Sequence, residues 1–115
     1  MDHTHCPYIY KAVITSVWDG DTCTADIDLG FGVILRKQKL RLLGVDAPEL
    51  RGDTLEEACA SRDWLREQVL DKEVIIETFK DRKGKYGRWL AEIHLGDINI
   101  NNQMITEGHA IPYEA

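Results

Sequence analysis

The chain has 115 residues, which is enough for one domain with a modest core but too short for two. Its 43% hydrophobic and 30% charged residues are typical of a globular protein, and no stretch approaches the ~20 apolar residues of a membrane span. The net charge of −6, taken alone, argues against a nucleic-acid partner, because phosphate binding usually leaves a basic footprint. The three cysteines are odd in number and widely spaced, which argues against a disulfide framework and a zinc ribbon, and we interpret them as free thiols.

The amino-terminal residues 1–7 contain no basic region followed by an apolar segment, so they do not resemble a secretory signal. We expect them to form a flexible tail, because terminal residues are usually poorly ordered. Residues 8–115 are expected to form a single domain. With neither a signal nor a membrane span, the protein is expected in the cytoplasm by default.

The first half of the chain is expected to form three consecutive strands. Residues 8–18 are rich in β-branched and aromatic side chains, which predicts a strand that ends at the turn Asp19-Gly-Asp-Thr22. Apolar and polar residues alternate from Cys23 to Leu29, as they do in a half-buried strand. The turn Gly30-Phe-Gly32 then leads into a long third strand, Val33 to Val45, in which a shift of the apolar phase indicates a bulge or a strong bend.

The end of this third strand has the character of a catalytic site. Arg41 lies within an apolar run, and a charged side chain in a buried strand needs an anionic partner or a ligand. Pro48 ends the strand, because it lacks a backbone donor and biases the preceding residue to an extended conformation. Asp46 and Glu49 are thereby left at the rim of the sheet. Two carboxylates beside an arginine are suited to metal binding combined with phosphate chemistry.

The second half is expected to contain a helix, two strands and a short helix. Asp53-Thr-Leu-Glu56 has the pattern of a capping box, which predicts the start of the first helix. Glu73 to Phe79 and Arg88 to His94 predict two strands, joined by the basic loop Lys80 to Gly87. Ile98 to Glu107 predicts the short helix. The predicted fold class is α+β, mainly β: a five-stranded barrel of the OB type with one helix after the third strand and a short helix after the fifth.

Two groups of basic residues offset the acidic net charge locally. By themselves they are as consistent with solvated faces of the protein as with phosphate-binding surfaces. One group lies on the third strand and the other in the loop before the fifth: Arg36, Lys37, Lys39 and Arg41, then Lys80, Arg82, Lys83, Lys85 and Arg88.

Three motifs, in their order and spacing, resemble those of the staphylococcal nuclease, or thermonuclease, family. They are Asp19-Gly-Asp-Thr22, Arg41-Leu-Leu-Gly-Val-Asp-Ala-Pro-Glu49 and Lys85-Tyr-Gly-Arg88. The resemblance runs from Tyr10 to Tyr113, nearly the whole chain. The three motifs together are far more specific than any one of them.

The resemblance implies a calcium site. Its protein ligands would be the carboxylates of Asp21 and Asp46 and the backbone carbonyl of Ala47, which stands where the family frequently has threonine. Hard oxygen ligands of this kind also suit Ca²⁺ on chemical grounds, because this ion accepts irregular geometry with water in the remaining positions.

The resemblance also implies roles in catalysis and substrate binding. Glu49 would orient or deprotonate the attacking water, and Arg41 and Arg88 would hold the phosphate. Arginine suits this role because its planar fork donates two hydrogen bonds to a phosphate. The residues that would contact the bound nucleotide are Lys85 and Tyr86 at its terminal phosphate and Tyr113 near its base.

The function expected from these residues is that of a calcium-dependent, sugar-nonspecific nuclease. By resemblance it would hydrolyse phosphodiester bonds of single-stranded DNA and RNA and leave 3′-phosphate ends. We expect no membrane partner and a monomer or weak homo-oligomer. The alternative is a catalytically weak nuclease-like module that binds nucleic acid or protein, although such modules typically lose the acids or arginines that this chain keeps.

Overall fold

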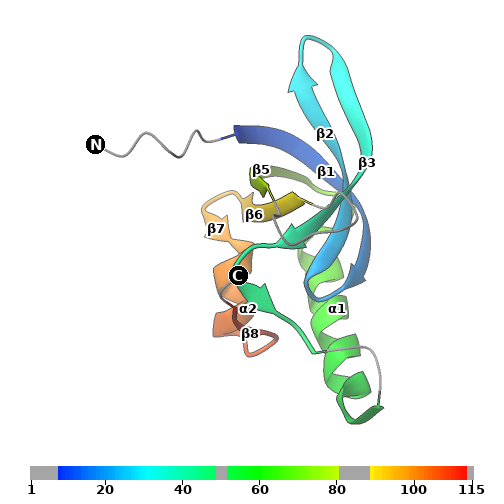
Figure 1. The fold of residues 1–115 in the computed structure, drawn as a ribbon, viewed down its shortest axis with the longest axis vertical. Coiled ribbons are helices and arrows are strands. Elements are labelled where there is room, and N and C mark those ends of the chain that lie inside the picture. Colours follow the sequence, from blue (N-terminus) through cyan, green and yellow to red (C-terminus); the bar gives the residue numbers. More distant parts are fainter. Residues whose placement is uncertain (1–7, 49–51, 81–88, 114–115) are drawn as a thin grey trace, which may run out of the picture.

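The computed structural model describes residues 8–48, 52–80 and 89–113 (Figure 1). Five strands form its centre: β1 (Tyr8–Asp19), β2 (Thr22–Gly30), β3 (Val33–Leu42), β5 (Glu73–Lys80) and β6 (Trp89–Leu95). They lie in the order β3-β2-β1-β5-β6, and a parallel pairing of β3 with β6 closes the sheet into a barrel. The prediction of a mainly β, five-stranded OB-type barrel with two helices is therefore confirmed.

The hydrophobic core fills the barrel and continues beneath the helices. Residues that alternate along each strand point inward, as the period of two requires. Cys23 is among them, and burial, followed by the nearby charge of Asp19, raises the pKa of its thiol to about 12, so this cysteine is unreactive. The largest fully buried side chains include Ile14, Leu40, Leu42, Leu65, Ile76, Ile93, Ile100 and Met104.

The predicted bulge in β3 is confirmed at residues 36 and 37. The register between β2 and β3 shifts there, and Lys37 has a positive φ of 56°. Asp26 on β2 stabilises the bulge, because its carboxylate accepts from the Lys37 amide at 3.0 Å and from the Arg36 guanidinium at 3.2 Å.

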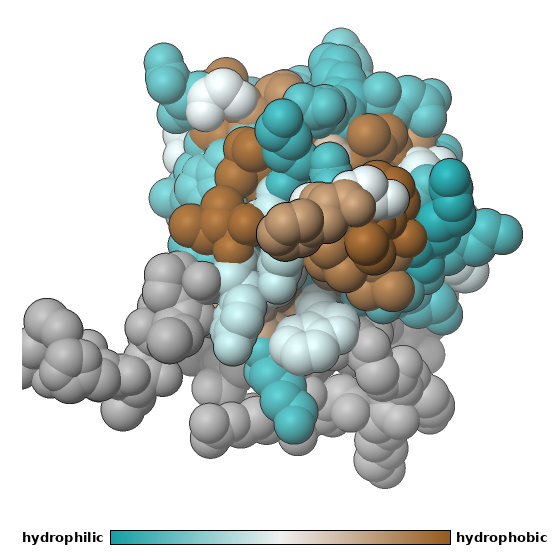
Figure 2. Space-filling view, turned by 90° about the horizontal axis from the view of Figure 1, so that it is seen from above, coloured by the Kyte–Doolittle hydropathy of each residue, from teal (hydrophilic) through white to brown (hydrophobic). Residues whose placement is uncertain are grey.

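Beyond the bulge, the β2–β3 hairpin projects from the barrel (Figure 1). Its side chains no longer have a core to pack against. Figure 2, which looks down on this end of the molecule, shows apolar side chains gathered around it. The exposed apolar residues of the hairpin are Leu29, Phe31, Val33, Ile34 and Leu35.

The third strand ends earlier than the apolar run predicted. β3 stops at Leu42, because Gly44 turns the chain with a left-handed φ of 78°. The next two residues form a separate strand, β4 (Val45–Asp46), which pairs with β8 (Ile111–Pro112) from the other end of the chain. The prediction of one continuous strand to Val45 was therefore wrong.

The helices differ from their predictions at their amino-terminal ends. A 3₁₀ turn, Gly52–Thr54, precedes α1 (Leu55–Val69), so Asp53 lies inside a helical turn instead of in an extended capping conformation. The side chain of Thr54 at the cap position does not bond to the first amides, and the predicted capping box is wrong. The second predicted helix also begins later than expected. Its first two residues form the short strand β7 (Ile98–Asn99), and the helix itself, α2, is Ile100–Thr106.

The cap of α2 is supplied by the side chain of Asn99, which accepts from the Asn102 amide at 3.2 Å. Within the described ranges, neither helix is long and apolar enough to cross a membrane.

Candidate active site

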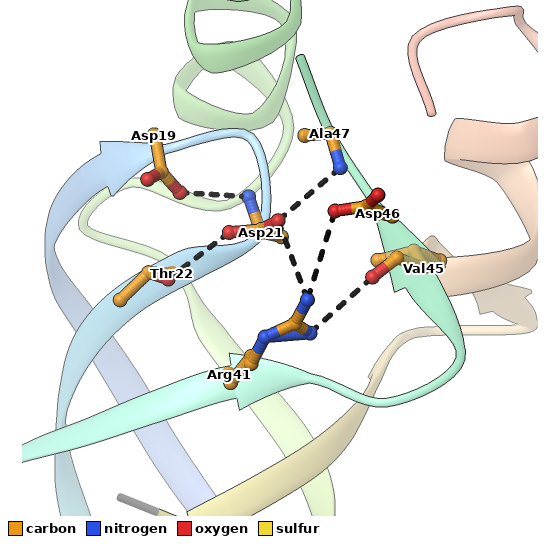
Figure 3. A network of polar contacts seen from close by, with 7 residues as sticks. All are labelled: Asp19, Asp21, Thr22, Arg41, Val45, Asp46 and Ala47. Atoms are coloured by element: carbon orange, nitrogen blue, oxygen red, sulfur yellow. Dashed lines mark hydrogen bonds and ion pairs between the residues drawn. The ribbon is translucent and has the colours of Figure 1, made fainter. Parts of the chain in front are cut away.

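Three segments meet at one rim of the barrel. Asp21 lies in the turn between β1 and β2, Arg41 is near the end of β3, and Asp46 and Ala47 are in and just after β4 (Figure 3). The backbone carbonyl of Asp21 accepts from the Leu42 amide at 2.8 Å, which fixes the turn against the end of β3. The four site residues from these segments thus converge, because the barrel brings the β1–β2 turn beside the end of β3.

The guanidinium of Arg41 lies between two carboxylates. Its Nη2 atom is 3.8 Å from Asp21 Oδ2 and 3.8 Å from Asp46 Oδ1, and its Nη1 donates to the Val45 carbonyl at 3.4 Å. The Arg41 side chain is only 16% exposed, so these charges are poorly screened by water. The expectation that Arg41 requires an anionic partner is confirmed.

Asp21 is the most firmly oriented carboxylate of the group (Figure 3). Its Oδ2 accepts from the Ala47 amide at 3.2 Å, and its Oδ1 accepts from the Thr22 hydroxyl at 3.1 Å. Its own amide donates to Asp19 Oδ1 at 3.0 Å. Both oxygens are thereby held in place before any ligand arrives, as a preorganised site requires.

Tyr113 completes one wall of the site. Its ring centroid lies 5.0 Å from the Arg41 guanidinium carbon, which is a cation–π distance. Its amide donates to the Gly44 carbonyl at 2.9 Å, so the β4–β8 pairing holds the ring in position. Tyr113 remains 40% exposed, so it can contact a ligand.

Helix α1 lies directly behind the turn that carries Asp21. A Cβ atom on Gly20 would collide with the Ser61 hydroxyl and come within 2.7 Å of the Ala47 Cβ. Only glycine fits between the helix and β4 at this point. The Ser61 hydroxyl in turn donates to the His109 carbonyl at 2.9 Å, which connects α1 to the segment leading into β8.

The structure brings together five of the nine predicted site residues: Asp21, Arg41, Asp46, Ala47 and Tyr113. The other four lie outside the described residues, so their predicted roles stay predictions: Glu49, Lys85, Tyr86 and Arg88.

Asp19 is a third acid of the site that the sequence analysis did not assign. Burial, followed by a hydrogen bond and charge repulsion from Asp21, raises the pKa of its carboxyl from 3.8 to about 6. The available signal was the position of both acids in the motif Asp19-Gly-Asp-Thr22, because a tight turn keeps alternate side chains close.

The donors at this rim fit a hard cation. Asp21 and Asp46 offer carboxylate oxygens on either side of Arg41, and no sulfur or imidazole ligand competes in the contacts of Figure 3. Across the described ranges no group of three or more His, Cys, Asp or Glu residues is arranged to hold a metal ion. Two carboxylates supplemented by a carbonyl and water are sufficient for Ca²⁺, which tolerates irregular coordination.

Replacing Asp19 by asparagine should stabilise the metal-free protein at high pH. A carboxyl whose pKa is raised from 3.8 to about 6 by folding stabilises the fold fully below pH 3.8, and that contribution is lost as pH rises through about 6. The asparagine side chain cannot ionise but can still accept from the Asp21 amide. We expect Asp19→Asn to be about 1 kcal/mol more stable than wild type at pH 8, because partial exposure screens the charge, and equal to it at pH 4.

Urea denaturation at both pH values, in chelator, measures this difference. Asp97→Asn, at an exposed turn, is the matched control, and its stability should equal that of wild type at pH 4 and also at pH 8. A difference between Asp19→Asn and wild type that does not change between pH 4 and pH 8 would contradict the assignment.

The fold and this rim together define an OB-type barrel with an arginine–carboxylate site suited to a phosphate and a hard cation. The family model described as "Staphylococcal nuclease homologue" matches residues 39–115 of the chain. The chain therefore belongs to the staphylococcal nuclease homologue family.

Relatives of known name agree with this assignment. The chain is 33% identical over 106 residues to the thermonuclease of Staphylococcus intermedius, an alignment that covers 90% of this chain and 57% of the relative. It is 33% identical over 104 residues to the thermonuclease of Staphylococcus hyicus, covering 88% and 57%. It is also 31% identical over 81 residues to "Probable staphylococcal-like nuclease CAN4" of Oryza sativa subsp. japonica, covering 70% and 15%. The chain spans just over half the length of the two thermonucleases.

Proposed function

We propose that the protein is a calcium-dependent, sugar-nonspecific nuclease that hydrolyses phosphodiester bonds of single-stranded DNA and RNA and leaves 3′-phosphate ends. The observation that carries the proposal is the position of Arg41 between the carboxylates of Asp21 and Asp46, with the ring of Tyr113 over its guanidinium. Membership of a family with nuclease relatives supports the class of activity.

Arg41 would bind the phosphate. Its planar fork can donate to two oxygens at once, and its low exposure strengthens those hydrogen bonds relative to water. The contacts at Nη1 and Nη2 already fix the orientation of the fork, so little freedom is lost when the phosphate binds.

Asp21, Asp46 and the Ala47 carbonyl would hold the cation, which when bound supplies positive charge to the phosphate oxygens. Asp21 needs no rearrangement for this, because the Ala47 amide and the Thr22 hydroxyl already orient it. Glu49, three residues beyond Asp46 and outside the described residues, would activate water as a general base. Tyr113 offers an exposed aromatic face to a base.

A direct assay tests the activity. The purified protein is incubated with single-stranded DNA or RNA, in calcium or in chelator, and the product ends are analysed. We expect cleavage of both polymers in calcium alone, with 3′-phosphate ends. Binding of the polymers without cleavage in either condition would favour the alternative of a catalytically weak binding module.

Asp21→Asn should abolish most of the stabilisation by calcium. A ligand that binds only the folded state at a hundredfold excess over its Kd stabilises the protein by ~2.7 kcal/mol. We expect a shift of that size in wild type with calcium plus a nucleoside 3′,5′-bisphosphate. The shift should be nearly lost in Asp21→Asn, since an amide is a much weaker calcium ligand than a carboxylate.

Thermal melts with chelator and with calcium plus the bisphosphate provide the measurement. The exposed Asp97→Asn variant removes the same charge away from the rim and should keep the full shift. Equal shifts in Asp21→Asn and wild type would remove Asp21 from the metal site.

A further inference from the structure

Lys39 lies on the same face of β3 as Arg41. Leu40 and Leu42 point into the core, so the residues that alternate with them point outward. The Lys39 ammonium lies 4.9 Å from the centroid of the Trp18 ring, at the end of β1. This cation–aromatic pair is separate from the contacts that form the candidate active site.

The indole of Trp18 is fixed at one edge and exposed elsewhere. Its Nε1 donates to the Thr24 hydroxyl at 2.8 Å, and Thr24 is directly opposite Lys39 in the β2–β3 register. The hydroxyl of Thr15 also donates to the Thr24 carbonyl, at 3.3 Å. Despite these anchors Trp18 is 55% exposed. A large aromatic ring that is both oriented and accessible is a typical platform for stacking.

The Trp18–Lys39 pair repeats the arrangement at Arg41. Thr22 is opposite Arg41 as Thr24 is opposite Lys39, and the ring of Tyr113 contacts Arg41 as the ring of Trp18 contacts Lys39. Two residues along a strand span about 6.6 Å. That length is comparable to the separation of successive phosphates in an extended polynucleotide.

The two cation–aromatic pairs, Tyr113–Arg41 and Trp18–Lys39, also follow one another along β3. Tyr113 bonds to Gly44, which comes after Arg41 in the chain, whereas Lys39 comes before it. The path from Tyr113 over Arg41 to Lys39 therefore runs along β3, away from the β4–β8 pair. Lys39 belongs to the basic group on this strand, which is locally positive in an acidic chain.

We propose that Trp18 and Lys39 form a second nucleotide subsite, which binds the nucleotide next to the one at Arg41 in a single-stranded polynucleotide. The base stacks on the Trp18 indole, and Lys39 moves from the ring to the adjoining phosphate. Stacking of a base on an aromatic ring is worth more than an exposed cation–π contact, so the exchange is favourable. The subsite reads no particular base, since every base has an aromatic face. The inference rests on the proposed function for the position of the first nucleotide.

Binding measurements with ligands of two lengths test the subsite. The ligands are thymidine 3′,5′-bisphosphate, which fills the first site alone, and hexathymidylate, which reaches the second. Binding is measured in the full chain carrying Glu49→Gln, which removes the carboxylate expected to activate water. We expect Trp18→Leu to raise the Kd of hexathymidylate by about tenfold and to leave the Kd of the bisphosphate within about twofold.

Three further variants separate stacking from a general loss of structure. Trp18→Phe keeps a ring and should retain most of the hexathymidylate affinity. Lys39→Gln should reduce the slope of log K against log salt by about 0.7, the value for one phosphate contact on a single strand. Phe31→Leu changes an even more exposed aromatic residue, on the hairpin, and should leave both affinities unchanged.

The outcomes distinguish the subsite from the proposed function. Loss of hexathymidylate affinity in Trp18→Leu in a protein that never hydrolyses nucleic acid would support the subsite and refute the nuclease. Hydrolysis by wild type, combined with unchanged hexathymidylate affinity in Trp18→Leu, would overturn the subsite alone. Equal losses for both ligands would also overturn it, because they indicate a distorted first site.

Discussion

Replacing Arg41 by lysine is expected to lower the rate of phosphodiester hydrolysis by ~10²-fold or more while the barrel stays folded. Lysine keeps the positive charge between Asp21 and Asp46. It cannot keep the second arm of the fork, which donates to the Val45 carbonyl, or the contact of the guanidinium with the Tyr113 ring. The variant would thus separate directed donation from charge alone.

Initial rates on single-stranded DNA in calcium, with circular dichroism to confirm folding, give the comparison. Arg36→Lys makes the same change on the exposed hairpin, where the guanidinium pairs with Asp26, and should retain wild-type rates. If Arg41→Lys kept more than about half the activity, the fork would have no part in catalysis.

Replacing Asn101 by leucine is expected to cost about 3 kcal/mol of stability, because the Ile93 amide and the Leu43 carbonyl lose their bonds to its side chain, and the Ala91 carbonyl keeps only its bond from the Leu43 amide. The Asn101 side chain is 2% exposed and makes three hydrogen bonds. Its Oδ1 accepts from the Ile93 amide at 3.1 Å, and its Nδ2 donates to the carbonyls of Leu43 at 2.8 Å and Ala91 at 3.0 Å. One side chain from α2 therefore holds together β6 and the residue that follows β3.

Urea denaturation measures this cost. Asn102→Leu is the matched control, because the next residue of α2 is exposed, and its change in stability should stay within about 0.5 kcal/mol. A loss below about 1 kcal/mol for Asn101→Leu would mean that water or a local shift satisfies the Ile93 amide and the Leu43 carbonyl.

Most of the barrel could be predicted from the sequence because its strands carry local signals. The alternation from Cys23 to Leu29 and the β-branched run of residues 8–18 each report a strand without knowledge of its partner. The pairing of β4 with β8 could not be predicted. Each of these strands has two residues, too few for a period, and their partners lie more than sixty residues apart.

The ends of elements were predicted less well, for a related reason. Leu43 and Val45 continue the apolar run of β3, so the break at Gly44 is hidden unless the backbone conformation is known. The Asp53-Thr-Leu-Glu56 pattern satisfies the rule for a capping box, but the chain forms a 3₁₀ turn at this point.

The sequence predicted the proximity of those site residues that are also close together in the chain. Arg41 is near the end of β3 and Asp46 is in β4, and only the turn at Gly44 separates the two strands, so their proximity follows from a short separation in the chain. The resemblance, rather than any local pattern, supplied Tyr113. The raised pKa of Asp19 depends first on burial, and the requirement for glycine at position 20 depends on the close approach of Ser61; the motif places Asp19 beside Asp21 but reports neither the burial nor the helix contact.

The close approach of α1 to Gly20 makes the site a product of cooperative folding. Ser61 in the helix is forty-one positions from that glycine, and the hydroxyl that lies behind it also holds His109 near the other end of the chain. An intermediate in which α1 had not docked would lack the support behind the turn and the link to β8. No partly folded state would then hold Asp21, Arg41 and Tyr113 together, so competence for ligand would arise in one step with the native state.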